Sequence, residues 1–115
     1  MVNKSLDGLR EPEKKALQEL KSYIEKVYNG RLKDIRLFGS KARGDAQIDS
    51  DIDIFLVLDR IDWEAEKALY DFVFELDLKY EVVISLVLYS EDEYRRAEVQ
   101  ATPFIKNVKK EGIPI

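Results

Sequence analysis

Cysteine and histidine are both absent from the 115 residues of the chain. Without cysteine the protein can form neither a disulfide nor a thiolate metal site, and without histidine it lacks the usual zinc ligand and the usual general base at neutral pH. Any acid, base or metal chemistry must therefore depend on carboxylates, of which the chain has 23.

Long apolar runs and an excess of positive charge are missing as well. No apolar stretch approaches the roughly 20 residues that cross a bilayer, and residues 1–10 lack the apolar core of a secretory signal, so we expect a soluble cytoplasmic protein with no membrane segment. The formal net charge is −4, whereas general nucleic-acid binders are usually basic. Direct DNA binding is therefore disfavoured, and we interpret Lys106, Lys109 and Lys110 as a solvated helix face.

The composition that remains suits one globular domain covering residues 1–115. Hydrophobic residues make up 45% of the chain, which is enough to bury a core. No internal repeat, low-complexity tract or linker divides the sequence. We therefore expect a single domain.

The first half of the chain predicts a helix followed by a strand. Apolar residues spaced three and four apart over residues 12–28 indicate one buried helical face, and Pro12 suits its first turn. Asn29-Gly30 is a stop signal. Apolar and charged residues then alternate over 31–38, as in a half-buried strand that ends at Gly39-Ser40.

The second half predicts two further strands and several helices. Residues 51–58 contain an unbroken apolar run typical of a central strand covered on both faces. Asp62 is expected to cap a helix over the sheet, and residues 82–88 to form a third strand. Ser90 and Glu93 then open a short acidic helix, and Thr102-Pro103 a last one. The order predicts an α/β fold with a small mixed β-sheet flanked by helices.

Two aspartates stand at the beginning of the predicted central strand. Asp51 and Asp53 are two residues apart, so their carboxylates point to the same face while Ile52 points to the other. Two buried like charges repel each other unless a cation lies between them, and carboxylate oxygens suit Mg²⁺. We therefore expect this pair to hold a divalent metal ion.

A candidate phosphate-binding segment lies just upstream of this pair. Glycine at position 39 lets backbone NH groups approach an anion, Ser40 adds a hydroxyl donor, and Arg43 offers a planar guanidinium that can grip phosphate oxygens. Gly44 then leads the chain towards Ser50. Each feature alone is common in proteins, but their joint order and spacing favour a phosphate site beside a metal site.

The segment from Gly39 to Asp53 resembles the signature of the polymerase-β-like nucleotidyltransferase superfamily, in particular its minimal nucleotidyltransferase branch. The resemblance implies the polymerase-β-like core, nucleotide contacts from Gly39, Ser40, Arg43 and Ser50, and metal contacts from Asp51 and Asp53. It also implies two Mg²⁺ ions and transfer of a nucleoside monophosphate, AMP from ATP being the expected case, to a hydroxyl group.

A third carboxylate is usual on a later strand of active members of this superfamily, and this chain departs from the pattern there. Ser85 occupies the expected position, and a serine cannot act as a metal-binding base at neutral pH. An incidental core serine is an equal alternative. Glu81 or Asp77 could substitute, although both suit the solvated end of the preceding helix.

Two classes of function therefore remain open at this stage. The first is an enzyme that modifies a partner protein or another acceptor, and the second is a weak or inactive nucleotide- and partner-binding module. In the minimal branch the resemblance implies a helical HEPN-type toxin as partner and an antitoxin role, with a homo-oligomer as the alternative. The apolar residues of the terminal helix, Phe104, Ile105 and Val108, together with Ile113 and Ile115, could contact such a partner, but we expect intramolecular packing.

Overall fold

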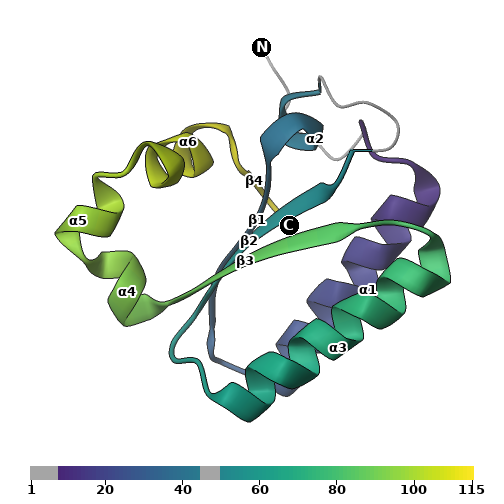
Figure 1. The fold of residues 1–115 in the computed structure, drawn as a ribbon, viewed down its shortest axis with the longest axis horizontal. Helices are drawn as coiled ribbons and strands as arrows, with labels where there is room; N and C mark the ends of the chain where they lie inside the picture. Colours follow the sequence, from purple (N-terminus) through teal and green to yellow (C-terminus); the bar gives the residue numbers. More distant parts are fainter. Residues whose placement is uncertain (1–7, 45–49) are drawn as a thin grey trace.

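The computed structural model describes residues 8–44 and 50–115, and a four-stranded sheet forms the centre of this part of the chain (Figure 1). The strand order is β3-β2-β1-β4; β1 is antiparallel to β2 and β4, and β2 is parallel to β3. The predicted small mixed sheet is confirmed. The elements are α1 Glu11–Val27, β1 Leu32–Phe38, α2 Gly39–Arg43, β2 Ile52–Leu58, α3 Trp63–Tyr80, β3 Ile84–Ser90, α4 Glu91–Arg95, α5 Ala97–Gln100, α6 Pro103–Glu111 and β4 Ile113–Pro114.

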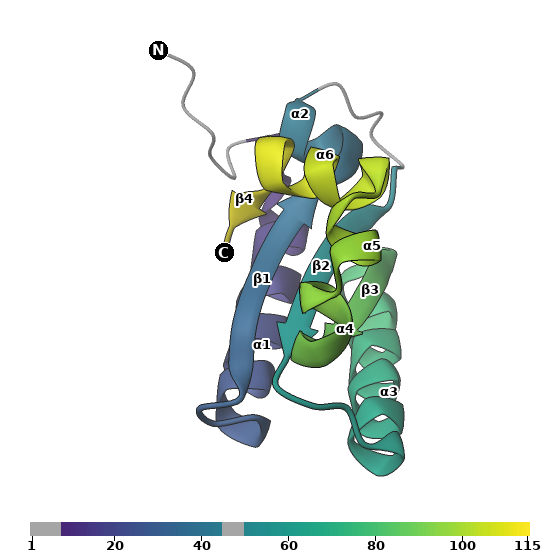
Figure 2. The ribbon, with the colours of Figure 1, turned by 90° about the vertical axis from the view of Figure 1, so that its left-hand side faces the viewer.

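Helices cover both faces of this sheet (Figures 1 and 2). Helices α1 and α3 pack side by side on one face, and α4, α5 and α6 lie on the other. Strand β2 contributes to both layers, since Ile52, Ile54 and Leu56 face α1 and α3, whereas Phe55 and Val57 face α4 to α6. The unbroken apolar run predicted for a central strand is confirmed, because both of its faces are buried.

Several helix ends follow the predicted capping signals. The Asp62 carboxylate accepts a hydrogen bond from the Ala65 NH at 2.8 Å, at the start of α3. At the start of α4 the Ser90 hydroxyl accepts from the Glu93 NH at 3.2 Å, and the Ser90 NH donates to the Glu93 carboxylate at 3.3 Å. Pro103 begins α6. Local sequence signals are therefore sufficient to start these helices.

The predicted third strand begins two residues too early. The Val82 NH donates to the Asp77 carbonyl at 3.1 Å, and the Ile84 NH donates to the Asp77 carboxylate at 3.0 Å. Both bonds connect this segment to the C-terminal end of α3, so the pairing with β2 starts only at Ile84. A side chain seven residues upstream thus sets the strand boundary, which alternation of residue types cannot show.

Three short elements, α2, α5 and β4, were not predicted. The chain forms a turn of helix, α2, immediately after β1, where the sequence indicated only a turn. After α6, Ile113 and Pro114 pair with Leu37 and Arg36 as the edge strand β4. Proline is tolerated on an edge strand because it need not donate to a neighbour.

Ile105 and Val108 of α6 pack within the molecule, as expected, whereas Phe104 remains 36% exposed. Ile105 and Val108 are buried against Phe55 and Val57 of the central strand. Ile113 is buried in the cluster on the other side of the sheet. These three buried residues are therefore not available to another chain.

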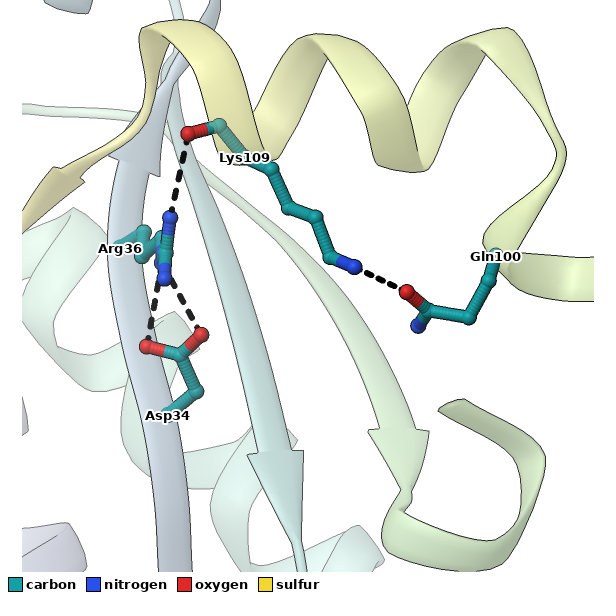
Figure 3. Close-up of polar contacts among 4 residues, drawn as sticks. All are labelled: Asp34, Arg36, Gln100 and Lys109. Atoms are coloured by element: carbon teal, nitrogen blue, oxygen red, sulfur yellow. Dashed lines mark hydrogen bonds and ion pairs between the residues drawn. The ribbon is translucent and has the colours of Figure 1, made fainter. Parts of the chain in front are cut away.

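Polar contacts hold α6 against the sheet (Figure 3). The Nε of Arg36 on β1 donates to both carboxylate oxygens of Asp34, at 2.9 and 3.2 Å, and its Nη1 donates to the Lys109 carbonyl at 3.5 Å. The Lys109 ammonium donates to the Gln100 side chain, which ties α6 to the end of α5. Helix α6 is therefore fixed beside the end of β1, where the candidate site begins.

The longest helix described is α3, with 18 residues, and it carries acids and lysines along its length. Within residues 8–44 and 50–115, no helix combines the length and apolar character that would let it traverse a lipid bilayer.

Candidate active site

The predicted site residues meet at the end of the sheet where β1 stops and β2 starts. Asp53 on β2 pairs with Phe38 on one side and with Ser85 of β3 on the other. Residues paired across strands project to the same face of a sheet. Asp53 and Ser85 therefore point to the face that α6 covers, and Gly39, which follows Phe38, stands beside Asp53.

Gly39 and the Asp53 carboxylate are in close contact. Gly39 has a φ of +74°, a conformation that residues with a side chain rarely adopt. A Cβ atom at this position would lie 2.4 Å from Asp53 Oδ2 and 3.2 Å from its Cγ. Only glycine lets the turn approach the aspartate this closely, so the sequence motif corresponds to a steric requirement.

Helix α2 carries the other predicted phosphate-binding groups. Ser40 lies in its first turn and is half-buried, and Arg43 lies at its end. The Arg43 guanidinium is 3.5 Å from the Glu111 carboxylate of α6, and its charge also acts on Asp53. Arg43 and Gly39 line the same cavity, so the arginine is within reach of an anion bound there.

The pKa of Asp53 is raised above its ordinary value. Burial is the main cause, repulsion by the Asp51 charge adds to it, and attraction by Arg43 opposes it. Asp51 itself is exposed and directly precedes β2, while the next residue, Ile52, donates its NH to the Val83 carbonyl at 2.8 Å. The expectation that both carboxylates are buried is therefore wrong for Asp51, but the two charges do repel each other.

Ser85 is the residue predicted to stand at the third carboxylate position. It pairs directly with Asp53 across β2 and β3, so both side chains project to the same face of the sheet. Glu81 is exposed at the end of α3, with a φ of +53°. Asp77 accepts the hydrogen bond that starts β3, although the Asp51 charge still contributes to its raised pKa, whose main cause is burial. Among the described residues, no group of three acids could hold a metal ion.

Ser50 is half-buried and directly precedes Asp51. The segment between Gly44 and Ser50 lies outside the described residues. Ser50 is therefore positioned at the same end of β2 as the aspartate pair.

The structure adds residues of α6 that the sequence did not connect with the site. A cavity of about 210 Å³ lies between α2 and α6, lined by Phe38, Gly39, Arg43, Phe104, Asn107, Val108 and Glu111. Its far wall comes from residues more than sixty positions away in the chain. The β1–β4 pairing and the contacts of Arg36 bring α6 next to α2. Both depend on residues far apart in the sequence, so the charge and aromatic content of α6 do not indicate that it lies at the site.

The donor set at Asp51 and Asp53 fits Mg²⁺. This ion is commonly held by one or two carboxylates and completes its shell with water and phosphate oxygens. Burial and the Asp51 charge both raise the pKa of Asp53, so a bound cation would stabilise its ionised form. The two carboxylates would hold the ion, and the Gly39 turn would bind the adjoining phosphate.

In buffer without divalent cations, Asp53→Asn is expected to increase the free energy of unfolding at neutral pH. The folded pKa lies above the ordinary value of 3.8, so the folded state binds more protons in that interval and stability falls as the pH rises through it. Asparagine removes this cost. Urea unfolding with and without Mg²⁺ checks it: Mg²⁺ should stabilise the wild type and leave the variant unchanged. Equal stabilisation of both proteins would contradict a metal ion at Asp53.

Two solved structures share this fold. A chain from a variant of the toxin–antitoxin complex MntA–HpeT superimposes with a TM-score of 0.53 at 21% identity, over 85% of this chain and 70% of that one. A candidate minimal nucleotidyltransferase gives a TM-score of 0.53 at 21% identity, over 89% of this chain and 94% of the other. The predicted fold, a small mixed sheet flanked by helices, is therefore shared with both structures.

Sequence comparison extends this likeness. A candidate protein adenylyltransferase of Methanocaldococcus jannaschii is 40% identical over 100 residues, covering 87% of this chain and 94% of its own, and a second one from the same organism is 28% identical over 100 residues, covering 86% and 94%. The family model for the nucleotidyltransferase domain matches residues 13–115. The chain therefore belongs to the nucleotidyltransferase domain family.

Proposed function

We propose that the chain transfers AMP from ATP to a hydroxyl group of a partner protein. The observation that carries the proposal is the contact of the Asp53 carboxylate with the Gly39 turn, where any side chain at position 39 would collide with it. This contact joins the candidate metal ligand to the candidate phosphate-binding turn. The similarity to two candidate protein adenylyltransferases supports the choice of nucleotide and of acceptor class.

The roles of the residues follow from their positions. Gly39 and Ser40 would bind the triphosphate through backbone NH groups and the serine hydroxyl, and Arg43 would exchange its contact with Glu111 for phosphate oxygens. Asp51 and Asp53 would hold Mg²⁺. When bound, two such ions neutralise the phosphate charge and favour attack by the acceptor oxygen.

The reaction is an in-line displacement. The acceptor oxygen bonds to the α-phosphorus, the bond from that phosphorus to the bridging oxygen breaks, and pyrophosphate leaves. The acceptor proton must reach water or one of the two aspartates, since Ser85 cannot accept it at neutral pH. We therefore expect slow transfer compared with relatives that carry a third carboxylate.

The test uses ATP labelled at the α-phosphate, Mg²⁺ and the product of the neighbouring gene as acceptor. Asp53→Asn is expected to reduce label transfer by about 100-fold or more, because removal of even an outer-shell partner of a metal site costs 10- to 100-fold. The matched control is Asp92→Asn, at an exposed aspartate of α4. Equal transfer by wild type and the Asp53 variant would refute the assignment.

A second candidate function is favoured by Ser85, which faces Asp53 where active relatives carry an acid. In that case the chain binds nucleotide and a helical HEPN-type toxin, acting as an antitoxin by complex formation; the fold shared with a toxin–antitoxin component supports it. The same experiment separates the two. A stable complex without label on the partner favours the binding module.

A further inference from the structure

Helix α3 carries a row of large exposed apolar side chains. Trp63, Tyr70, Phe74 and Leu78 have exposed fractions of 74%, 42%, 62% and 67%. Their spacings of seven, four and four residues place them along one side of the helix, over about 22 Å at 1.5 Å per residue. We call these four residues the α3 stripe.

The stripe has no role in the core of the chain. The opposite side of α3 supplies Leu69, Val73 and Leu76, which are buried against α1 and the sheet. A helix needs one apolar face to pack, so the second apolar face of α3 is surplus to folding. Contiguous exposed apolar surface of this kind marks an interaction site.

A cavity at one end of the stripe could accept a side chain of a partner. Trp63 and Tyr70 line a cavity of about 220 Å³, and Glu66 and Lys67 form the rest of its wall. Aromatic walls around a pocket of this size suit a single inserted side chain, which is the usual form of the strongest contact in a protein interface.

The charged residues beside the stripe indicate which charge a partner should carry. Along α3 five acids, Glu64, Glu66, Asp71, Glu75 and Asp77, accompany two lysines. Lys67 lies 3.8 Å from Asp71, and Lys79 lies 3.0 Å from Glu19 of α1, so both lysines already have acidic partners. The surroundings of the stripe are therefore negative.

We propose that the α3 stripe docks an amphipathic helix of another protein whose apolar face is flanked by lysine or arginine. A second copy of this chain would bring the same acidic surroundings against the stripe, and like charges across an interface disfavour association. The four side chains form a ridge along α3, which can pack into a groove between the side chains of a partner helix. This proposal does not depend on nucleotidyl transfer.

The location of the stripe is compatible with simultaneous use of the candidate active site. Helix α3 covers one face of the sheet and α6 lies over the other (Figure 2). By its strand register, Asp53 points to the face under α6. The stripe ends at Leu78, next to Asp77. The Asp77 carboxylate accepts a hydrogen bond from the NH of Ile84, the first residue of β3. A helix docked there extends towards the edge of the site without covering the Gly39 turn.

The test uses two fluorescently labelled helical peptides of about 18 residues, with one apolar face and either lysine or glutamate flanks. The lysine peptide is expected to bind the full chain at least about tenfold more tightly than the glutamate peptide, and to lose affinity as salt is added. Trp63 is the one tryptophan of the chain, so its fluorescence should shift to shorter wavelength on binding.

Variants locate the contact. Phe74→Ala and Leu78→Ala should each weaken binding of the lysine peptide by about tenfold or more, whereas Val27→Ala, at an exposed apolar residue of α1, should not. Equal binding of the two peptides, no binding of either, or equal effects of Phe74→Ala and Val27→Ala would overturn the proposal. Sedimentation showing a dimer of the chain that Phe74→Ala dissociates would overturn it in favour of self-association.

Discussion

Replacing Gly39 by alanine is expected to abolish measurable nucleotide binding and to lower the free energy of unfolding by several kcal/mol. Two costs combine. The φ of +74° disfavours any residue with a Cβ atom, at about 1–2 kcal/mol. The new methyl group would also stand 2.4 Å from Asp53 Oδ2, so the turn and the aspartate must move apart, which separates the phosphate site from the metal site.

Gly30 provides the matched control. Its φ is +76°, nearly that of Gly39, yet a Cβ atom there would meet no atom within 4 Å. Gly30→Ala should therefore cost only the conformational part, about 1–2 kcal/mol, and leave ATP binding unchanged. Gly44, at +84° and equally open, gives a second control next to α2. Urea unfolding and calorimetry with MgATP measure the two quantities.

A double variant separates the steric cost from the conformational one. Asp53→Ala removes the carboxylate that the new methyl group would meet, so Gly39→Ala with Asp53→Ala should regain stability relative to Gly39→Ala alone, without regaining nucleotide binding. If Gly39→Ala and Gly30→Ala cost the same stability, and both still bind MgATP, the close contact has no functional meaning.

The fold could largely be predicted from the sequence because its main elements have strong local signals. The period of apolar residues places α1, the cap at Asp62 starts α3, and the apolar run after Asp53 identifies a strand covered on both faces. Strand β4 could not be predicted, since two residues carry no periodicity and pair with β1 only after α6 has folded back.

The candidate site could be predicted only in part, for a related reason. The Gly39 turn and the aspartates are close in sequence, so a short motif describes them. Glu111 reaches the site from the far end of the chain and looks locally like a solvated acid. The exposure of Asp51 depends on which strand lies beside it, which the residue pattern does not specify.

A buried ion pair next to the Gly39–Ser40 turn could not be predicted from the sequence either. Lys41 lies within the motif and Glu13 lies in the first turn of α1, where acids are common for helix-dipole reasons. Charged side chains such as these are usually exposed, so the sequence alone places both at the surface. In the structure they are buried, with exposed fractions of 6% and 1%, and their charged groups are 2.7 Å apart. This ion pair joins α1 to α2 and thereby holds the Gly39–Ser40 turn in place.

Lys41→Met is therefore expected to lower the free energy of unfolding by about 3–5 kcal/mol, because it leaves Glu13 buried without its cation. It should also weaken MgATP binding, since α2 loses its attachment to α1. Lys15→Met, at an exposed lysine of the same region, should change neither quantity. Replacing both partners, by Glu13→Leu with Lys41→Met, should recover much of the stability, because no isolated charge then remains buried.

The pH dependence of this loss distinguishes a charge effect from simple repacking. Burial raises the pKa of Glu13, but hydrogen bonds from Lys41 and the Arg10 NH, together with the charges of Lys41 and Arg10, lower it below 4.5 overall. The stability from the pair is therefore present above the ordinary carboxylate pKa and lost as the pH falls through the lower folded value. Without Lys41, burial instead raises the pKa of Glu13, so the variant takes up a proton before the wild type does, and the gap in unfolding free energy between wild type and Lys41→Met should narrow as the pH falls through the carboxylate range. A gap that stays constant from neutral to acidic pH would instead mean that Lys41 contributes packing and that its charge does not position the turn.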